Sequence, residues 1–436
     1  MRDIIILSIV FAAGVAALRK PWIGIMLWTW LSIMNPHRYT WGIAFDAPLA
    51  AFAAGTVAVG FLFSREKIWP LREAASVLLV FLMVWMTLSW LGGLDPARDY
   101  SEWKKVMKID AMIIVALAVL HSKQHILALL WVSAGSLALL GAKGGLFTLM
   151  TGGDYRVWGP PDSFIDDNNG FALALIMTIP LLRFLQLQLT DKRGRFVMTL
   201  LMLLCGVAAI GTYSRGAFLA IAAMMVALWW RSKTKRGLGM VLIVAGMLLI
   251  AFMPDAWMLR MSTIQDYEQD ASAMGRISAW WTAWGIGQHY PLGVGFDTAR
   301  PALFAMYSPY PGMVHAAHSI YFQMLGNHGF VGMFLFLGVF IATWRSASWL
   351  RSNAARIPQA AWCAELAGFC QVALIGYAVG GAFLSLAYFD LPYDIMVVVV
   401  LARRWVESRA WEREPQYKKG WLTVPGLIRP RAASAT

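Results

Sequence analysis

The sequence is poor in charged residues and in cysteine. Asp, Glu, Lys and Arg make up 14% of its 436 residues, whereas about 25% is usual for a soluble protein. Three cysteines are present, Cys205, Cys363 and Cys370, and each lies in an apolar segment. The low charge excludes a soluble enzyme and a disordered chain, and so few cysteines in such places exclude a disulfide-stapled fold.

Apolar residues dominate instead, at 59% of the chain with 22 Trp, 23 Phe and 24 Met. This composition predicts an all-α, polytopic integral membrane protein. A membrane-spanning helix needs about 20 residues, and several apolar runs are shorter, so we expect about 12 transmembrane helices. The candidate runs lie at about 4–18, 22–34, 43–63, 74–92, 107–120, 125–149, 169–187, 196–213, 216–230, 238–253, 330–345, 362–386 and 391–402.

The net charge of +13 is better explained by membrane topology than by nucleic-acid binding. Lys and Arg accumulate in cytoplasmic connections, and basic clusters recur where spans alternate. A smaller part of this charge is available for anionic lipids. The connections at about 151–168, 212–216 and 254–329 then face outward, whereas the orientation of the N-terminus stays open. The basic clusters lie at 64–67, 192–195, 231–236, 345–356 and 403–404.

The segment 254–329 is too long and too rich in aromatic residues to serve only as a connection between two spans. Long loops of this kind usually carry function. We expect this periplasmic loop to be largely helical, because helical periodicity appears at Ile277–Trp284. The domain organisation predicted is one transmembrane helical domain, 1–410, that includes the loop, followed by a cytoplasmic tail, 411–436. We expect a monomer in contact with membrane lipids.

Two arginines stand out in the outward connections. Arg215 lies between two apolar runs in Tyr213-Ser-Arg-Gly, and Arg276 precedes the turn Pro291-Leu-Gly-Val-Gly295. Arginine suits phosphate because its planar fork makes two parallel charged hydrogen bonds. The alternative for Arg215 is a long side chain that marks the membrane interface.

Two histidines follow, His315 and His318. Histidine titrates near neutral pH and can take a proton from a sugar hydroxyl. Two histidines three residues apart on a helix also suit a metal. Because no cysteine or nearby carboxylate completes such a site, we predict no metal and no cofactor.

Other residues are weaker candidates for binding a diphosphate or a glycan. Lys143 and Asp390 lie at outer ends of spans, where an interface lysine and a helix cap are the ordinary alternatives. A functional Asp390 would orient His318 or pair with an arginine. Arg300 is expected to be a solvated loop charge. The full set of further candidates is Lys143, Arg156, Asn168, Asn169, His315, Tyr321 and Asp390.

The order of these motifs resembles the O-antigen ligase superfamily over roughly residues 150–400. Its members share an SRG segment, an R…PxxGxG segment and an HNxYL…GxxG segment, matched here by Arg215, Arg276 and His318. Ser319 stands where the family commonly has Asn. The upstream stretch GPPDSFIDDNNGFAL from Gly159 is also similar to this family, and to ligases associated with exosortase systems.

The resemblance implies transfer of a glycan from undecaprenyl diphosphate to an acceptor hydroxyl at the outer face of the bacterial inner membrane. For a ligase the acceptor is the lipid A-core, and the product is lipopolysaccharide. His318 would activate the acceptor, and Arg215 and Arg276 would stabilise the departing diphosphate, without metal, by an inverting reaction. An O-antigen polymerase and a protein O-glycosylation ligase share these motifs.

A transporter is the rival from another class. It would place ionisable residues near the middle of the bilayer and show internal repeats. Here the candidates cluster at the outer edge and no repeat is seen, so we favour the enzyme.

Overall fold

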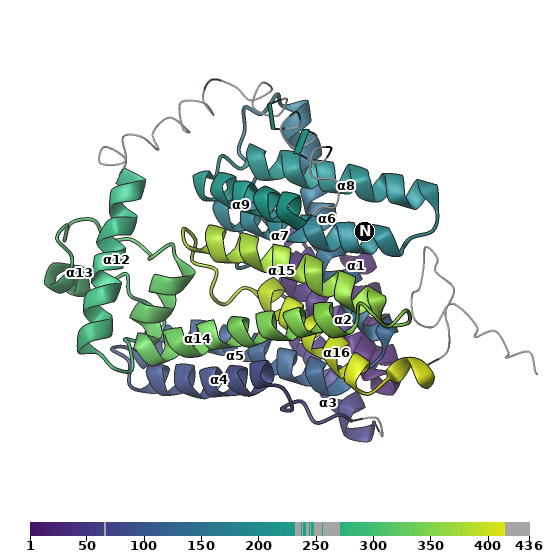
Figure 1. Cartoon of the computed structure of the whole chain (residues 1–436). Coiled ribbons are helices and arrows are strands. Elements are labelled where there is room, and N and C mark those ends of the chain that lie inside the picture. Colours follow the sequence, from purple (N-terminus) through teal and green to yellow (C-terminus); the bar gives the residue numbers. More distant parts are fainter. Residues whose placement is uncertain are drawn as a thin grey trace, which may run out of the picture.

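A computed structural model describes residues 1–64, 67–231 and 271–414, with a few isolated positions between 237 and 255. The prediction of an all-α protein is confirmed, because the elements of the described residues are α-helices and short 3-10 helices (Figure 1). The first half of the chain forms α1 (Arg2–Arg19), α2 (Pro21–Met34), η1 (Pro36–Tyr39), α3 (Leu49–Phe63), α4 (Ala74–Leu91), α5 (Pro96–Val119), α6 (Lys123–Met150) and α7 (Asn168–Gln188).

The second half continues with helices that flank the long loop expected from the sequence. These elements are α8 (Lys192–Gly211), α9 (Arg215–Arg231), α12 (Ala271–His289), α13 (Pro301–Tyr307), α14 (Ile320–Asn353), α15 (Ala361–Gly381), α16 (Asp390–Glu407) and η3 (Ala410–Glu412). The predicted loop helix is confirmed within α12. Residues 256–270 of the loop and most of the tail lie outside the described residues, and the apolar run 238–253 has only isolated positions in them.

Six described helices, α4, α6, α7, α8, α14 and α15, are long and apolar enough to cross a membrane, and α2, α3 and α9 are shorter apolar helices. The expected count of about 12 spans is therefore not confirmed. Helices α1, α5 and α16 carry more charged residues than these apolar helices, as in the Lys104-Lys105 and Arg403-Arg404 pairs, and the apolar run 238–253 has only isolated described positions.

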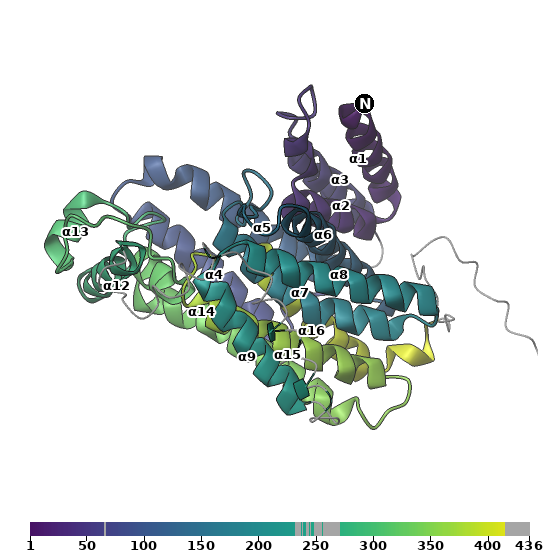
Figure 2. The ribbon, with the colours of Figure 1, turned by 90° about the horizontal axis from the view of Figure 1, so that it is seen from above.

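The long helices lie side by side, with α7 packed between α8 and α15, and α14 between α4 and α15 (Figures 1 and 2). Helix α16 is the most enclosed, since residues 390–402 are buried throughout. The helices α1–α3 form a group of their own that meets the remainder chiefly where α2 packs on α6 (Figure 2). The three cysteines are free and buried, as their apolar surroundings predicted.

One basic pair departs from its predicted role as a simple orientation signal. The guanidinium of Arg404 is buried and forms an ion pair with Glu73, with nitrogen–oxygen distances of 2.5 and 2.9 Å. It also donates to the carbonyl oxygens of Pro70 and Leu117. Because a buried charge must be paired to be tolerated, Arg404 ties α16 to the segment before α4.

The connections predicted to face outward meet at one end of the helices, which we call the His318 end. There α12 and α13 stand beyond the ends of α4 and α14 (Figure 1, left). Helix α14 is interrupted at Gly329, whose φ of +66° is left-handed. The break lets the first turns of α14, which follow His318, lie at a different angle from the long apolar part.

Candidate functional site

The turn between α8 and α9 is held by the connection before α7. The side chain of Asn168 donates to the Thr212 carbonyl at 2.7 Å, and the Tyr213 hydroxyl donates to the Gly153 carbonyl at 2.6 Å. Tyr213 has a left-handed φ of +60°, a strained conformation that persists only when neighbours enforce it. Ser214 caps α9 by accepting from the Ala217 amide, so Arg215 is placed firmly as the first residue of that helix.

Asp167 starts α7 at the same end. Its carboxylate accepts hydrogen bonds from the backbone amides of Asn169 and Gly170, at 2.8 and 3.1 Å, as an N-cap does. Asn168 is buried, and the Asn169 side chain donates to it at 3.2 Å. Both predicted asparagines therefore shape the turn around Asp167. The side-chain amide of Asn168 is already used in its hydrogen bond to the Thr212 carbonyl.

His318 lies on the segment between α13 and α14, one residue before the N-cap Ser319. Its φ of +42° is left-handed, which is uncommon outside glycine. Helix α12 fixes this segment, because Trp280 donates to the Ala317 carbonyl at 2.7 Å. The His315 ring packs directly on Gly275, where a Cβ atom would come within 2.4 Å of it.

The charges around His318 identify its neighbours. Burial lowers the pKa of His318 below its ordinary value of 6.5, and the positive charge of Arg276 lowers it further. The carboxylate of Asp167 acts in the opposite direction, and His315 adds a smaller lowering effect. Three separate parts of the chain thus meet around one imidazole, which is neutral at neutral pH and able to accept a proton.

Arg215 joins this group through a short chain of contacts. Its neighbour Gly216 lies against Phe383, which follows α15. The Phe383 ring is 6.4 Å from that of Trp280, and Trp280 lies one helical turn beyond Arg276 on α12. The starts of α7, α9 and α14 and the first turns of α12 therefore converge at the His318 end.

The glycines of the PxxGxG segment serve backbone packing. Gly293 and Gly295 have φ of +77° and +109°, and a Cβ on Gly293 would come within 2.1 Å of the Asn327 carbonyl oxygen. The amide of Gly295 donates to that same oxygen at 3.1 Å. The segment is locked against the break in α14, so its role here is to hold the framework behind His318.

Two charged residues of this framework form an ion pair that the sequence did not predict. Asp99 is buried, accepts from the Phe296 amide at 2.8 Å, and pairs with Arg300 at 3.3 Å. The expectation of a solvated Arg300 is wrong, because its side chain is 14% exposed and bound to a buried carboxylate. The two residues are 201 positions apart, and no local pattern signals such a pair.

Asn327 and His328 complete the framework. Asn327 donates to the Phe296 carbonyl and to the Tyr388 hydroxyl, and the His328 ring lies within 2.7 Å of that hydroxyl and 2.9 Å of Ser89 Oγ. These buried groups satisfy one another. They fix α14 against α4 and the segment before α16.

Lys143, Arg156 and Tyr321 lie around the site in other contacts. The Lys143 ammonium lies 4.8 Å from the Tyr39 ring centroid, and the Arg156 guanidinium 5.8 Å from that of Tyr213. Tyr321 donates its hydroxyl to the Ala378 carbonyl. Arg156 thus borders the Arg215 turn, whereas Lys143 faces η1.

Asp390 lines a cavity that does not contain His318. It is buried, and its carboxylate accepts from Ser32 Oγ at 2.5 Å. It is the first residue of α16, and Phe389 holds the N-cap position. The groups that alter the pKa of His318 do not include Asp390, so the prediction that it orients His318 gains no support.

Among the described residues, no three His, Cys, Asp or Glu side chains lie close enough together to hold one metal ion. The acidic residues Asp266, Glu268 and Asp270 of the long loop are outside those residues. His315 and His318 therefore have no completed set of metal ligands in the part of the chain that the structure describes.

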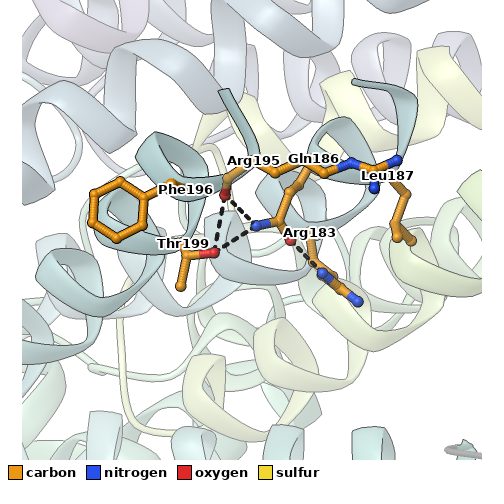
Figure 3. A pocket seen from close by; sticks show the side chains of 6 residues that line it. All are labelled: Arg183, Gln186, Leu187, Arg195, Phe196 and Thr199. Atoms are coloured by element: carbon orange, nitrogen blue, oxygen red, sulfur yellow. Dashed lines mark hydrogen bonds between the residues drawn. The ribbon is translucent and has the colours of Figure 1, made fainter. Parts of the chain in front are cut away.

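A cavity of about 320 Å³ lies at the opposite end, between α7 and α8 (Figure 3). Gln186 donates to Thr199 Oγ1 and to the Arg195 carbonyl, both at 2.6 Å, and accepts from Arg183. Asn168 begins α7 and Gln186 lies in its last turn, about 27 Å away at 1.5 Å per residue. This cavity is therefore separate from His318, and its polar groups largely satisfy one another.

Comparison with known families divides the chain into two parts. Residues 200–337 match a family model described as O-antigen ligase, and residues 1–190 match a family of unknown function. No curated protein matches the chain. The first match includes Arg215, Arg276 and His318, and with the apolar helices it indicates a multi-pass membrane protein that acts on lipid-linked glycans. It confirms the resemblance drawn from the motifs: residues 200–337, which carry all three of them, are similar to the O-antigen ligase family.

Proposed function

We propose that this protein is an O-antigen ligase, which transfers a glycan from undecaprenyl diphosphate to a sugar hydroxyl of lipid A-core in the outer leaflet of the bacterial inner membrane. The family match supports the ligase and polymerase class of activity. The observation that carries the proposal is that the segment bearing His318 packs on the first turns of α12, which bear Arg276. The start of α7 and the turn that bears Arg215 lie at the same end.

The reaction needs a proton acceptor and a stabilised leaving group. In the proposed mechanism His318 takes the proton of the acceptor hydroxyl, whose oxygen forms a bond to the anomeric carbon. The bond from that carbon to the diphosphate oxygen breaks at the same time on the opposite face, which inverts the anomeric centre. Arg215 and Arg276 hold the negative charge of the departing diphosphate, and the proton on His318 passes to solvent.

Reconstituted transfer tests this function. Purified protein in lipid nanodiscs, with undecaprenyl diphosphate-linked glycan and lipid A-core, should form glycosylated lipid A-core in the presence of EDTA, because arginine charge replaces a metal. Loss of activity in EDTA and recovery with one divalent ion would overturn the arginine mechanism. Product formed only by extension of the donor glycan, or only on a protein acceptor, would assign the polymerase or the protein ligase reaction instead.

The topology makes a prediction that is independent of activity. A cysteine at Ser308 or Gly312, next to the site, should react with a membrane-impermeant maleimide in intact spheroplasts, whereas one at Ser352 or Ser232 should not. Gly312 is exposed with open space around it, and Ser352 is exposed at the far end of α14. The three native cysteines are buried and provide the unlabelled background. The reverse labelling pattern would place the site in the cytoplasm and contradict the proposal.

The pH dependence of transfer should follow the charges around His318. Since burial and Arg276 lower the pKa of His318, the neutral base is already formed at neutral pH, and activity should fall only below about 6.5. Arg276→Gln removes the charge that lowers this pKa, so the acidic limb of the pH–activity profile should move to higher pH. Asp167→Asn keeps an N-cap residue and should move that limb to lower pH. Identical limbs in all three proteins would exclude His318 as the titrating group.

A further inference from the structure

A second cavity, of about 380 Å³, is lined in part by the connection that precedes α7. Its walls are the end of α2 with η1, the N-terminal half of α5, residues 162–164, and Asp390 at the start of α16. We call it the lysine pocket. None of the proposed catalytic residues His318, Arg215 and Arg276 lines it.

The pocket carries an excess of positive charge. Lys104, Lys105 and Lys108 all line it from α5, and their spacing of three and four residues sets them on one helix face. Within the described residues none of the three takes part in an ion pair. Like charges at this spacing destabilise a helix, so the arrangement is one that a bound anion would relieve.

The other walls hold groups that suit a sugar. Lys105 lies 3.9 Å from the Phe164 ring centroid, and Trp28 adds a second aromatic wall. The Asp390 carboxylate, held by Ser32, is an acceptor for hydroxyl groups. The Nδ1 atom of His37 is buried without a hydrogen-bond partner. Unlike the cavity in Figure 3, this pocket thus keeps polar groups that are not saturated by one another.

The place of the pocket links it to the reaction. Phe164 lines the pocket, and Asp167, three residues later, is the carboxylate that influences His318. Three residues of chain span at most about 11 Å. The lysine pocket and the carboxylate that acts on His318 are therefore joined by a short stretch of chain, and the pocket lies at the His318 end of the helices.

We propose that the lysine pocket binds a phosphate or carboxylate group carried by a sugar of the glycan substrates. The proposal rests on the proposed function, since it places a substrate sugar in the pocket. The lysines hold the anionic group, and the aromatic rings and Asp390 hold the sugar that bears it.

Lysine protection tests this binding without any turnover. The full chain in phosphatidylcholine nanodiscs is acetylated with a water-soluble reagent, and each lysine is followed by mass spectrometry. Glucose 6-phosphate should protect Lys104 and Lys108, inorganic phosphate should need about tenfold more, and glucose should give no protection. Lys192, an exposed lysine at the opposite end, should react equally in every sample.

Each other outcome overturns the proposal. Protection by phosphatidylglycerol in the nanodisc, with none from glucose 6-phosphate, would make the pocket a lipid headgroup site. Equal protection by phosphate and glucose 6-phosphate would leave no sugar recognition, and no protection by either would leave no anion site.

Kinetics then separate this proposal from the proposed function. In an active preparation, the double variant that carries both Lys104→Gln and Lys108→Gln should show about a tenfold higher KM for an anionic glycan substrate, with kcat little changed. The Lys192→Gln variant should match the wild type. Wild-type protein that shows protection but no transfer would defeat the proposed reaction and keep the anion site. Glycan transfer without lysine protection would overturn the anion site and keep the proposed reaction.

Discussion

Replacement of His318 should reduce glycan transfer by about 10²–10⁴-fold, the usual contribution of a positioned proton acceptor, while donor binding stays close to that of the wild type. The acceptor proton is lost only as the new bond forms, so the interaction acts in the transition state and not in the donor complex. Turnover and donor affinity should be measured on the same nanodisc preparation.

The choice of substitution matters because His318 has a left-handed backbone. Asparagine adopts that conformation more readily than alanine, so His318→Asn removes the base with less strain, and His318→Ala reports both the lost base and the added strain. His289 on α12 is a matched control, since it is exposed and its ring contacts the Gly285 carbonyl and Tyr307. Full activity in His318→Asn would remove His318 from the mechanism.

Replacement of Arg215 or Arg276 by alanine should weaken donor binding as well as turnover. The diphosphate is charged both before and during the reaction, so these side chains act in both states. A lost charged hydrogen bond costs about 1.5–3 kcal/mol, which is about 10- to 150-fold in the donor dissociation constant. Lysine should restore little, because a point charge cannot replace the two-pronged guanidinium.

Arg98 provides the matched control for these arginines. It lies at the His318 end and forms an exposed ion pair with Asp297 at 2.8 Å, and exposed pairs contribute little. Arg98→Ala should therefore leave donor affinity near that of the wild type. If both arginine variants kept full donor affinity while His318→Asn lost it, the assigned roles would be inverted.

The class of fold and the ordered motifs were readable from local properties of the sequence. Apolar runs report how segments partition between membrane and water, and this depends on composition alone. The SRG segment, Arg276 and the segment after Ala317 carry a resemblance that the family match confirms. The helix expected at Ile277–Trp284 also follows from a local period of hydrophobic residues, and it forms the middle of α12.

Pairings between distant residues depended on the folded chain. Asp99 with Arg300, and Glu73 with Arg404, are buried ion pairs between elements far apart in sequence, and in the sequence each of these residues reads as an ordinary surface charge. The same reason explains Asp390, which faces α2 and the lysines of α5. Hydropathy and motif spacing are properties of neighbouring residues, whereas the partner of a buried charge is selected by how the helices pack.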